Sequence, residues 1–455
     1  MFRTKYNSDG SIARYKARLV ALGCNQEIGL DYHETFSPVA KIPTFHILIT
    51  VALHNSWSIH QLDVSNAFLH GSLNEIIYMK QPPGFQDNAH STHICKLNKA
   101  IYGLKQSPRQ WFSTLTGYLS SLGFCTSSYD PSLFLYCKDH VRLYFLIYVD
   151  EFIMTGNGNT ALQELIRKLH SRFKMRKLGN LSQFLGITTV TTEAGLILHQ
   201  QRFAHIILER AGMLNCKPVS TPICTKDPTL STESAIFSNP LLYHQLVGSL
   251  QYLTLTRPDI AYAVNRACQF MHQPTNYHFH LLKRILRFIK GSLNTGLPLA
   301  RQSIALTSYE DSDWAGDRQD RKSTTGYCTF LGNSIVSWSV KKQTTVARSS
   351  TEAEYRALAS AATEVIWTRQ LLQELGHPQQ SPTTLFCDNV SAIALANNPV
   401  FHARTKHIEV DCHFIRECIK NNTIQVHHIS SKDPRLQIYL SKLYLRPDFV
   451  SYPTN

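Results

Sequence analysis

The stretch "RLYFLIYVDEFIMTG" at residues 142–156 places two adjacent carboxylates between two apolar segments. Seven apolar or aromatic residues precede Asp150 and Glu151, and three apolar residues follow them. This pattern predicts a β-hairpin with the acids at the junction of its strands. A turn alone explains Asp-Glu poorly, because tight hairpin turns favour Asn-Gly or Asp-Gly. The pair is therefore a candidate functional site as well as a candidate turn.

The composition is that of a multidomain globular protein with excess positive charge. The chain has 455 residues, of which 43% are hydrophobic. At roughly 100–200 residues per domain, two to four domains are expected. The formal net charge is +14, which favours a polyanionic partner such as nucleic acid or simply promotes solubility.

The cysteines and apolar runs narrow the class of protein. The 11 cysteines are scattered without a CxxC pair, which argues against a zinc ribbon or a disulfide framework and favours a reducing compartment. No apolar run reaches the ~18–20 residues that a membrane span needs, so no membrane partner is expected. The N-terminus lacks a signal-peptide core. It begins inside an apparent strand, so we expect an N-terminal truncation.

Helical and extended patterns alternate along the chain. Composition changes in the Pro/Ser/Thr-rich segment 216–240, which predicts a linker or long loop. A helical segment follows to about Lys290, and a second boundary is expected near residues 291–302. Beyond it, strands, a long helix and a further strand and helix form an α/β pattern. Earlier in the chain, the sequence predicts helices at 45–57, 107–124 and 161–175, and a strand leading into a helix or turn at 58–71.

The same device recurs along the chain: an apolar strand ends in an acid. A helical acid, Glu354, borders the apolar stripe of its helix. Clustered carboxylates repel one another unless a cation lies between them, and Mg²⁺ prefers oxygen ligands. Pairs of such ions support attack and departure of oxygen at phosphorus. The acids, which predict two phosphoryl-transfer sites, are Asp63, Asp150, Glu151, Asp311, Glu354 and Asp388.

Each acid also has a purely structural explanation. Motifs for nucleotide-binding loops, serine hydrolases and HExxH zinc enzymes are absent from the sequence, so no other chemistry competes. The structural explanations are a hairpin turn at Asp150–Glu151, a strand-end cap at Asp63, a capping box formed by Thr351 and Glu354, preference for Asp313 over Asp311, and an Asx turn at Asp388–Asn389.

Ordered motifs extend over nearly the whole chain. They include "ETFSPVAK", "QLDVSNAFLHG", "LNKAIYGLKQSPRQWF", "YVDEFIMTG", "TRPDIAYAV", "DSDWAGDRQDRKSTTGYC", "SSTEAEYRALA" and "CDNVSAIALANNPVFHARTKHIEVDCHFIRE". Together they resemble the reverse transcriptase–ribonuclease H region of copia-type retrotransposon Pol polyproteins. The resemblance implies an α+β right-hand polymerase of fingers, palm and thumb, followed by an α/β ribonuclease H-like domain. The implied boundaries are 1–190 (fingers and palm), 191–300 (thumb and connection), 301–445 (ribonuclease H-like) and 446–455 (tail).

The resemblance also implies roles for individual residues. Asp63, Val64, Asp150 and Glu151 would bind metal in the palm, where the family motif reads YVDD. Asp311, Glu354 and Asp388 would do so in the ribonuclease site, which makes Glu354 more than a cap. Each site would hold two Mg²⁺ ions, with Mn²⁺ as a substitute. The implied substrate-binding residues are Lys16 and Arg18 at the triphosphate, Phe68 at the ribose, and Lys105, Gln106 and Arg109 at template and nucleotide.

The basic residues and Phe68 keep simpler explanations. Phe68 is equally suited to a core position, and Lys16 and Arg18 to a solvated strand face. On the helix "HFHLLKRILRFIKG", Lys283, Arg287 and Lys290 share one face. That face would bind the phosphates of a template–primer duplex, or else is simply solvated. The sequence leaves both explanations open for each of these residues.

Two departures from the family pattern bear on activity. Glu151 carries one methylene more than the family's aspartate, and Gln437 stands where the family has a fourth ribonuclease acid. The resemblance implies an RNA-directed DNA polymerase with ribonuclease H activity, impaired by these changes. The competing hypotheses are a catalytically inactive relic that binds nucleic acid, and a scaffold without nucleic acid. The implied partners are an RNA template, a DNA primer, RNA–DNA hybrid and dNTPs. The implied location is the cytoplasm, in virus-like particles if the element is active, with the nucleus as a second possibility.

Overall fold

The computed structural model describes residues 2–6, 11–223, 235–398 and 408–430, without the side chains of some strand residues near the N-terminus. The chain divides into two compact units. The first contains residues 1–41 and 58–181, and the second contains residues 42–57 and 182–455. This division into compact units falls at 181–182 and assigns residues 42–57 to the second unit. The domain boundaries at 190, 300 and 445 implied by the resemblance stay predictions. The finer division into thumb, connection and tail stays a prediction.

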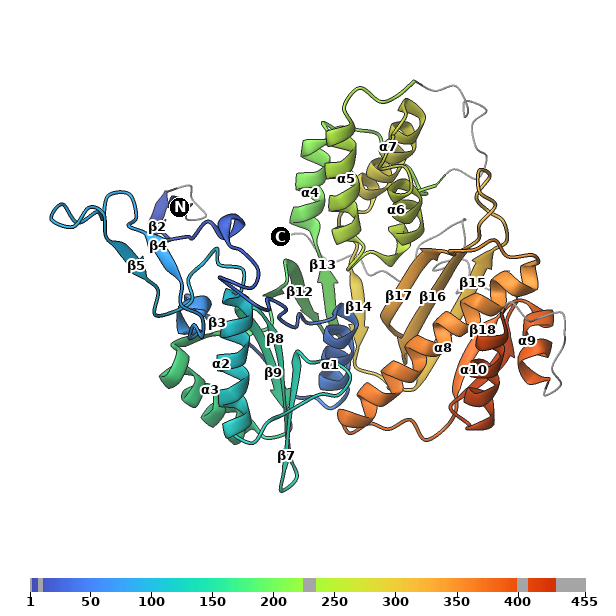
Figure 1. Cartoon of the computed structure of the whole chain (residues 1–455). Helices are drawn as coiled ribbons and strands as arrows, with labels where there is room; N and C mark the ends of the chain where they lie inside the picture. The colour runs from blue at the N-terminus through green and yellow to red at the C-terminus, as the bar shows by residue number, and fades with distance from the viewer. Residues whose placement is uncertain (1, 7–10, 224–234, 399–407, 431–455) are drawn as a thin grey trace. The chain divides into compact units, whose positions relative to one another are not determined.

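The first unit is built on a six-stranded sheet of order β10-β3-β9-β8-β7-β6. The helices α2 (Ser107–Ser121) and α3 (Asn159–Phe173) pack on the sheet (Figure 1). Apolar side chains of α2 and α3, spaced three or four residues apart, form one core with those of the strands. The strands are β3 (Ile59–Val64), β6 (Cys125–Thr126), β7 (Leu133–Lys138), β8 (Val141–Tyr148), β9 (Glu151–Gly156) and β10 (Met175–Asn180).

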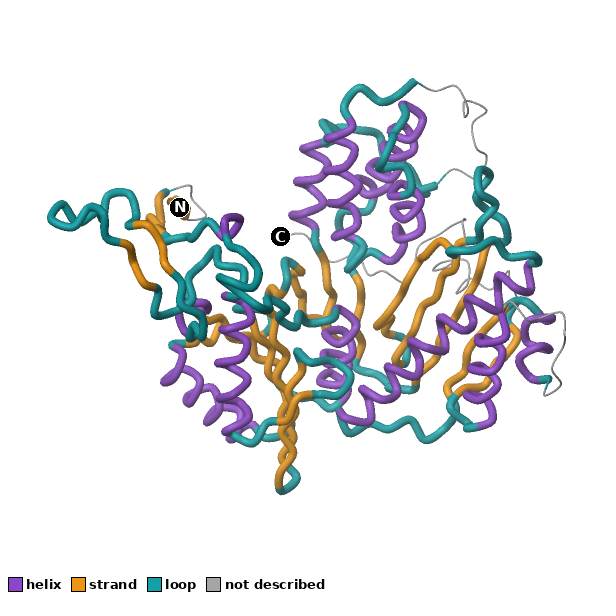
Figure 2. The backbone as a smooth tube through the Cα atoms, viewed as in Figure 1, coloured by secondary structure: helices purple, strands orange, loops and turns teal. Residues whose placement is uncertain are grey.

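Smaller elements complete the first unit. Two short antiparallel pairs stand outside the main sheet, and one-turn 3-10 helices punctuate the loops. Much of the chain between these elements is loop (Figure 2). The elements are β1 (Phe2–Tyr6) with β2 (Ile12–Ala17), β4 (Tyr78–Lys80) with β5 (Ile94–Lys96), η1 (Gly23–Asn25) and η2 (Ala67–His70).

The helix α1 (Ile42–His54) belongs to the second unit, although it precedes β3 in sequence. Every residue from Thr44 to Leu53 is buried, as expected for a helix that is apolar all round. It packs on β14 and β17. The Nδ1 of His46 lies 3.1 Å from the Val336 carbonyl oxygen, and its ring stacks on Trp338. These contacts fix α1 within the second unit.

A four-stranded antiparallel sheet and a helical group form the middle of the second unit. The sheet order is β11-β12-β13-β14, and the helices α4 to α7 share one apolar core. The bounds are β11 (Gln183–Phe184), β12 (Ile187–Thr192), β13 (Gly195–His199), β14 (Leu297–Ala300), α4 (Gln201–Arg210), α5 (Pro240–Leu253), η3 (Pro258–Ile260), α6 (Ala261–Cys268) and α7 (Asn276–Gly291).

The strand β14 lies where the sequence predicted a boundary. Its pairing with β13 joins segments about a hundred residues apart, which no local pattern reveals. Pro298 fits this edge strand, since proline cannot donate to a second neighbour. Gly195 is required at the close approach, because a Cβ there would lie 2.1 Å from the Leu299 carbonyl oxygen.

The C-terminal part of the second unit is a five-stranded mixed sheet of order β17-β16-β15-β18-β19. β15, β16 and β17 are antiparallel, whereas β18 and β19 run parallel to β15. The long α8 lies across the sheet, with α9 and α10 beside it (Figure 1). The bounds are β15 (Leu306–Asp313), β16 (Thr324–Leu331), β17 (Ser334–Lys342), α8 (Ser350–Glu374), β18 (Thr383–Cys387), α9 (Val390–Asn397), α10 (Glu409–Lys420) and β19 (Ile424–His428).

The mixed helix-and-sheet class expected from sequence is confirmed, as are the predicted helices at α1, α2 and α3 and the strand–helix order after residue 303. None of the helices in the described part of the chain is long and apolar enough to span a bilayer.

Candidate active sites

The hairpin of β8 and β9 carries Asp150 in its turn and Glu151 in its second strand. Tyr148 pairs with Glu151, so the two-residue connection is Val149–Asp150 rather than Asp150–Glu151. Val149 has φ of 55°, a conformation that is costly for a β-branched residue. Asp150 is thus a turn residue and remains a site candidate, because both explanations hold for the same side chain.

Trp111 supports this strained turn through a hydrogen bond. Its Nε1 donates a hydrogen bond of 2.7 Å to the Val149 carbonyl. The indole is 1% exposed and belongs to the core beneath the sheet. The amide of Val64 donates to the Asp150 carbonyl at 3.0 Å. The turn is therefore fixed from two sides by groups that lie outside the hairpin.

Asp63 lies in a row of charged residues that crosses three strands. It pairs with Glu151 of β9 on one side and with Arg176 of β10 on the other. Directly paired residues project from the same sheet face, with Cβ atoms about 4.5–5.5 Å apart. The structure therefore brings two predicted palm acids together and adds Arg176, which no motif indicated and which only the strand pairing reveals.

Tyr102 is a second residue that the sequence motifs did not indicate. Burial raises the pKa of its hydroxyl, the Arg18 charge opposes this, and the charges of Asp150 and Asp63 add to it. The guanidinium of Arg18 lies 4.6 Å from the centre of the Tyr102 ring, and the Phe68 ring centre lies 4.7 Å away. Arg18 and Phe68 thus meet beside the palm acids. Phe68 also packs on the core, so its simpler explanation holds as well.

The predicted substrate residues of the "GLKQSPR" motif bind a neighbouring loop. The Lys105 amine donates to the Gln26 carbonyl and to the Tyr32 hydroxyl, each at 3.2 Å. The buried Gln106 accepts from the Gln26 side chain, and its amide donates to the Asp31 carbonyl at 2.8 Å. These contacts order the loop before α1.

Two further predicted substrate residues have distinct environments. Arg109 forms an ion pair of 2.6 Å with the exposed Glu34, a pair that solvent screens. Lys16 lies in β2, opposite Arg3, but its side chain is outside the described part of the structure.

The three predicted ribonuclease acids converge. Tyr309 of β15 pairs with Phe386 of the parallel β18, and Asp311 and Asp388 each follow two residues later. Equal offsets from paired positions place them side by side at the carboxyl ends of the two strands. Ligand oxygens of Asp311, Glu354 and Asp388 all lie within 4.8 Å of one another. This donor set of three carboxylates suits a hard divalent cation such as Mg²⁺.

The capping box expected at Thr351 and Glu354 is wrong. The N-cap of α8 is Ser349, whose hydroxyl accepts from the Glu352 amide at 3.2 Å. The Glu352 carboxylate in turn accepts from the Arg348 amide at 2.8 Å. The sequence offers the same spacing in two frames, two residues apart, and the helix uses the earlier one. Glu354 is therefore released from capping.

Hydrogen bonds also show which residues near Asp388 and Asp311 have structural roles. Asn389 caps α9 by accepting from the Ala392 amide at 2.9 Å, so the turn chemistry belongs to Asn389 rather than to Asp388. Asp313 accepts from the Tyr262 hydroxyl at 3.1 Å and from the Thr324 amide. Asp313 is thus engaged in structure, whereas Asp311 belongs to the acid group.

Burial shapes the electrostatics of this acid group. Burial, followed by the charges of Glu310, Asp311 and Asp388, raises the pKa of Glu354 to about 11. Burial also raises the pKa of Asp388, which the His428 charge opposes. Burial and repulsion both favour the protonated carboxyl. A cation bound at the triad would oppose these shifts by favouring the ionised carboxylates.

The basic face of α7 is partly occupied. The Arg287 guanidinium donates to the Lys217 carbonyl at 2.7 Å, while the exposed Lys283 amine lies 4.8 Å from the centre of the Phe279 ring. Lys290 is half-buried near the end of the helix. Of the three predicted phosphate ligands, Lys283 is the most accessible.

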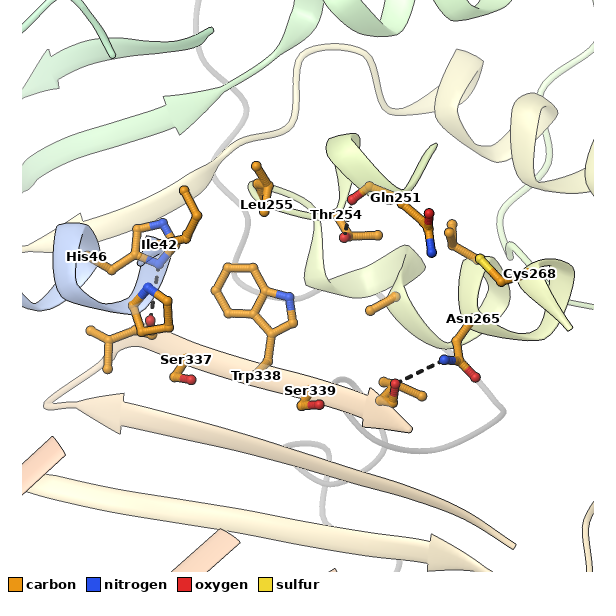
Figure 3. A pocket seen from close by; sticks show the side chains of 15 residues that line it. Ile42, His46, Gln251, Thr254, Leu255, Asn265, Cys268, Ser337, Trp338 and Ser339 are labelled. Atoms are coloured by element: carbon orange, nitrogen blue, oxygen red, sulfur yellow. Dashed lines mark hydrogen bonds between the residues drawn. The ribbon is translucent and has the colours of Figure 1, made fainter. Parts of the chain in front are cut away.

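A pocket of about 320 Å³ lies among α1, α5, α6 and β17 (Figure 3). His46 and Trp338 line one side, and Asn265, which donates to the Val340 carbonyl, lines the other. No acidic side chain and no predicted site residue lines it. The pocket therefore contains none of the acids proposed as metal ligands.

Comparison with known proteins identifies the family. Residues 1–225 match the family model described as reverse transcriptase (RNA-dependent DNA polymerase). Over 454 residues the chain is 48% identical to the "Retrovirus-related Pol polyprotein from transposon RE1" of Arabidopsis thaliana, covering 99% of this chain and 31% of that protein. The chain belongs to the copia-type retrotransposon Pol family. The Pol polyprotein from transposon TNT 1-94 of Nicotiana tabacum is 38% identical, with 95% of this chain and 33% of that protein covered.

The Pol relatives are longer than this chain, which spans about a third of their length. A solved structure, the foamy viral protease-reverse transcriptase in complex with RNA/DNA hybrid, is similar over 92% of this chain and 48% of that chain. It is 13% identical, with a TM-score of 0.47. The assignment to the Pol family rests on the sequence relatives.

Proposed function

We propose that the chain is an RNA-directed DNA polymerase joined to a ribonuclease H, acting on a template–primer duplex by phosphoryl transfer. The observation that supports this best is the convergence of Asp311, Glu354 and Asp388, whose ligand oxygens lie within 4.8 Å of one another. In the first unit, Glu151 pairs directly with Asp63, and Asp150 precedes Glu151 in the β8–β9 turn. Membership of the reverse transcriptase family supports the same reaction class.

In the palm, Asp63, Asp150 and Glu151, with the Val64 carbonyl, would hold two Mg²⁺ ions, or Mn²⁺ in their place. When bound, such ions lower the pKa of an attacking oxygen and offset charge on the leaving one. Asp63 and Asp150 orient the site, since one lies within a paired strand and the other in a turn fixed by Trp111.

Near these acids, Arg18 and Phe68 would bind the incoming dNTP. The Arg18 guanidinium, held over Tyr102, carries a permanent charge for the triphosphate. Phe68, whose ring also packs against Tyr102, would exclude a ribose 2′-OH. Lys16 would add a second cation. Gln106 and Lys105 would act through the loop that they order, and Arg109 through its exposed guanidinium.

In the ribonuclease site, Asp311, Glu354 and Asp388 would hold two Mg²⁺ ions against the RNA strand of an RNA–DNA hybrid. The rigid β15–β18 pairing positions two of these acids, and α8 supplies the third. Gln437, in the place of a fourth acid, lies outside the described residues. One carboxylate fewer weakens ion binding at the site without removing it.

Glu151 is the main reason to expect reduced polymerase activity. One methylene moves a carboxylate by roughly 1–1.5 Å, and a misplacement of about 1 Å can cost about 100-fold in rate. The proposal is therefore an impaired polymerase rather than a fully active one.

The decisive experiment is primer extension on an RNA template with Mg²⁺. Asp63→Asn should abolish extension, whereas the exposed Asp139→Asn should leave it unchanged. Cleavage of an RNA–DNA hybrid should be lost in Asp311→Asn and largely kept in Asp313→Asn. In the latter, the asparagine oxygen can still accept from the Thr324 amide, and its NH2 can donate to the Tyr262 hydroxyl. Extension that persists in Asp63→Asn would contradict the proposal.

A second candidate function is a relic that binds nucleic acid without catalysis. Glu151, placed directly opposite Asp63, is the observation that favours it. Absence of extension and cleavage, even in Glu151→Asp, with retained hybrid binding would support this candidate. Binding should weaken steeply between about 50 mM and 200 mM salt and should depend on Lys283 of α7.

A cytoplasmic location within virus-like particles, or a nuclear one, is proposed from family membership and is tested by imaging a tagged chain.

A further inference from the structure

Glu310, the neighbour of Asp311 on β15, is buried without a normal partner. Its side chain is 0% exposed. Neither carboxyl oxygen has a hydrogen-bond partner of normal geometry in the described part of the chain. The groups that act on it are the Cys387 thiol and the carboxyls of Glu354, Asp311 and Asp388, none of which is cationic. A buried carboxyl in such surroundings costs stability.

A second potential ligand group surrounds this carboxyl. Ligand atoms of Glu310, Glu354 and Cys387 all lie within 4.8 Å of one another, and all three residues are buried. Side chains alternate between the faces of a strand, so Glu310 lies on the face of β15 opposite to Asp311. Glu354 of α8 is the residue that both groups share.

The donor types distinguish this group from the three-carboxylate triad. Cysteine sulfur is a ligand that Zn²⁺ and similar ions accept, whereas Mg²⁺ takes oxygen ligands. Ligand atoms within 4.8 Å of one another are near enough to share one ion, because zinc ligands lie about 2.0–2.3 Å from the metal. An ion would offset the repulsion between the two buried carboxylates.

We propose that Glu310, Glu354 and Cys387 form a binding site for a thiophilic divalent cation such as Zn²⁺, beside the proposed Mg²⁺ site. Three protein ligands leave one position of a tetrahedral zinc ion for water.

Occupation of this site has a consequence for the ribonuclease function, and this step rests on the proposed function. Glu354 belongs to both ligand groups. An ion bound to Glu310 and Cys387 would therefore partly neutralise the Glu354 carboxylate and fix its side chain, so that it binds the neighbouring Mg²⁺ less well. Zn²⁺ should therefore slow hybrid cleavage more than it slows primer extension, because no palm residue takes part.

The test of the site uses Co²⁺ as a spectroscopic probe on the full chain, because a cobalt–thiolate bond absorbs in the near ultraviolet. The unaltered chain should show this absorption at one equivalent of Co²⁺, and Zn²⁺ but not excess Mg²⁺ should remove it. Cys387→Ser and Glu310→Gln should each weaken binding by at least about 100-fold, since even outer-shell changes cost about 10–100-fold.

Matched variants separate this site from other thiols and from the triad. Cys328→Ser changes another buried thiol and should keep the absorption, as should Asp388→Asn. If Cys387→Ser fails to fold, Glu310→Gln decides, because it preserves the size of the side chain.

Two results would overturn the proposal. One is an absence of thiolate absorption, which would mean that the two carboxyls share a proton and hold no ion. The other is absorption that survives both Cys387→Ser and Glu310→Gln. Because the absorption is measured without substrate, it decides the site even if the chain proves catalytically inactive.

Discussion

Asp63 and Glu151 face one another directly across the antiparallel pair β3–β9. Like charges in directly opposed positions destabilise a sheet. Arg176 pairs with Asp63 from the other side and carries a charge that can offset this repulsion, as a bound metal ion would. The longer side chain of Glu151 therefore lies where it changes the distance between its carboxylate and that of Asp63.

Shortening this side chain should increase polymerase activity. In Glu151→Asp the carboxylate retracts by roughly 1–1.5 Å, and we expect the extension rate to rise by about 10–100-fold. The measurement is single-turnover primer extension at saturating Mg²⁺, with Glu151→Gln as the charge-removing control. An unchanged or lower rate in Glu151→Asp would show that Glu151 is not the cause of impairment.

Removing the Trp111 hydrogen bond should loosen the turn. Trp111→Phe leaves the Val149 carbonyl without its indole donor, which should cost about 1–3 kcal/mol of unfolding free energy and slow extension. Trp314→Phe, which removes a 3.1 Å indole hydrogen bond to the Ala347 carbonyl in the other unit, is the control. Trp314→Phe should leave the extension rate unchanged. An equal loss of extension rate in both variants would argue against a specific role of Trp111.

The frame of the α8 cap can be tested by stability alone. Ser349→Ala should lower the unfolding free energy by about 1 kcal/mol, the usual cost of losing an N-cap. Thr351→Ala should change it by only a few tenths, because Thr351 lies inside the first turn. The measurement is urea unfolding of both variants. A larger loss in Thr351→Ala would restore the later frame.

Acid should destabilise the second unit through His46. Burial lowers the pKa of His46 to about 4, partly opposed by its hydrogen bond to the Val336 carbonyl. The unfolded chain therefore binds the proton first, and stability that is complete above about pH 6.5 is lost as the pH falls toward 4. At pH 5 this loss is about 2 kcal/mol.

The His46 contribution is measured as the difference between denaturation at about pH 7.5 and pH 5. His46→Gln, which cannot titrate, should lose about 2 kcal/mol less than the unaltered chain. Equal pH dependence in both proteins would place the acid-sensitive group elsewhere.

Local patterns predicted much of this fold because their periods are strong. The β8–β9 hairpin, α2 and α3 follow from apolar spacing, and the acids follow from strand ends. The residues Tyr102 and Arg176 were missed because their closeness to Asp63 arises from a loop contact and from β10 pairing with β3. The cap of α8 was misplaced because two frames share one spacing. Strand β14 was missed because its partner lies about a hundred residues away.

The place of α1 in the chain has a consequence for synthesis. Ribosomes release roughly 5–20 residues per second, so this largely apolar helix emerges long before β14 and β17, on which it packs. The apolar side chains of α1 therefore lack their β17 partner while some 280 further residues are synthesised. Cutting the chain at one position does not separate the units, because residues 42–57 of the second unit lie in sequence between the two segments of the first. We expect N-terminal fragments that end before β17 to bind chaperones or aggregate, whereas the full-length chain does not.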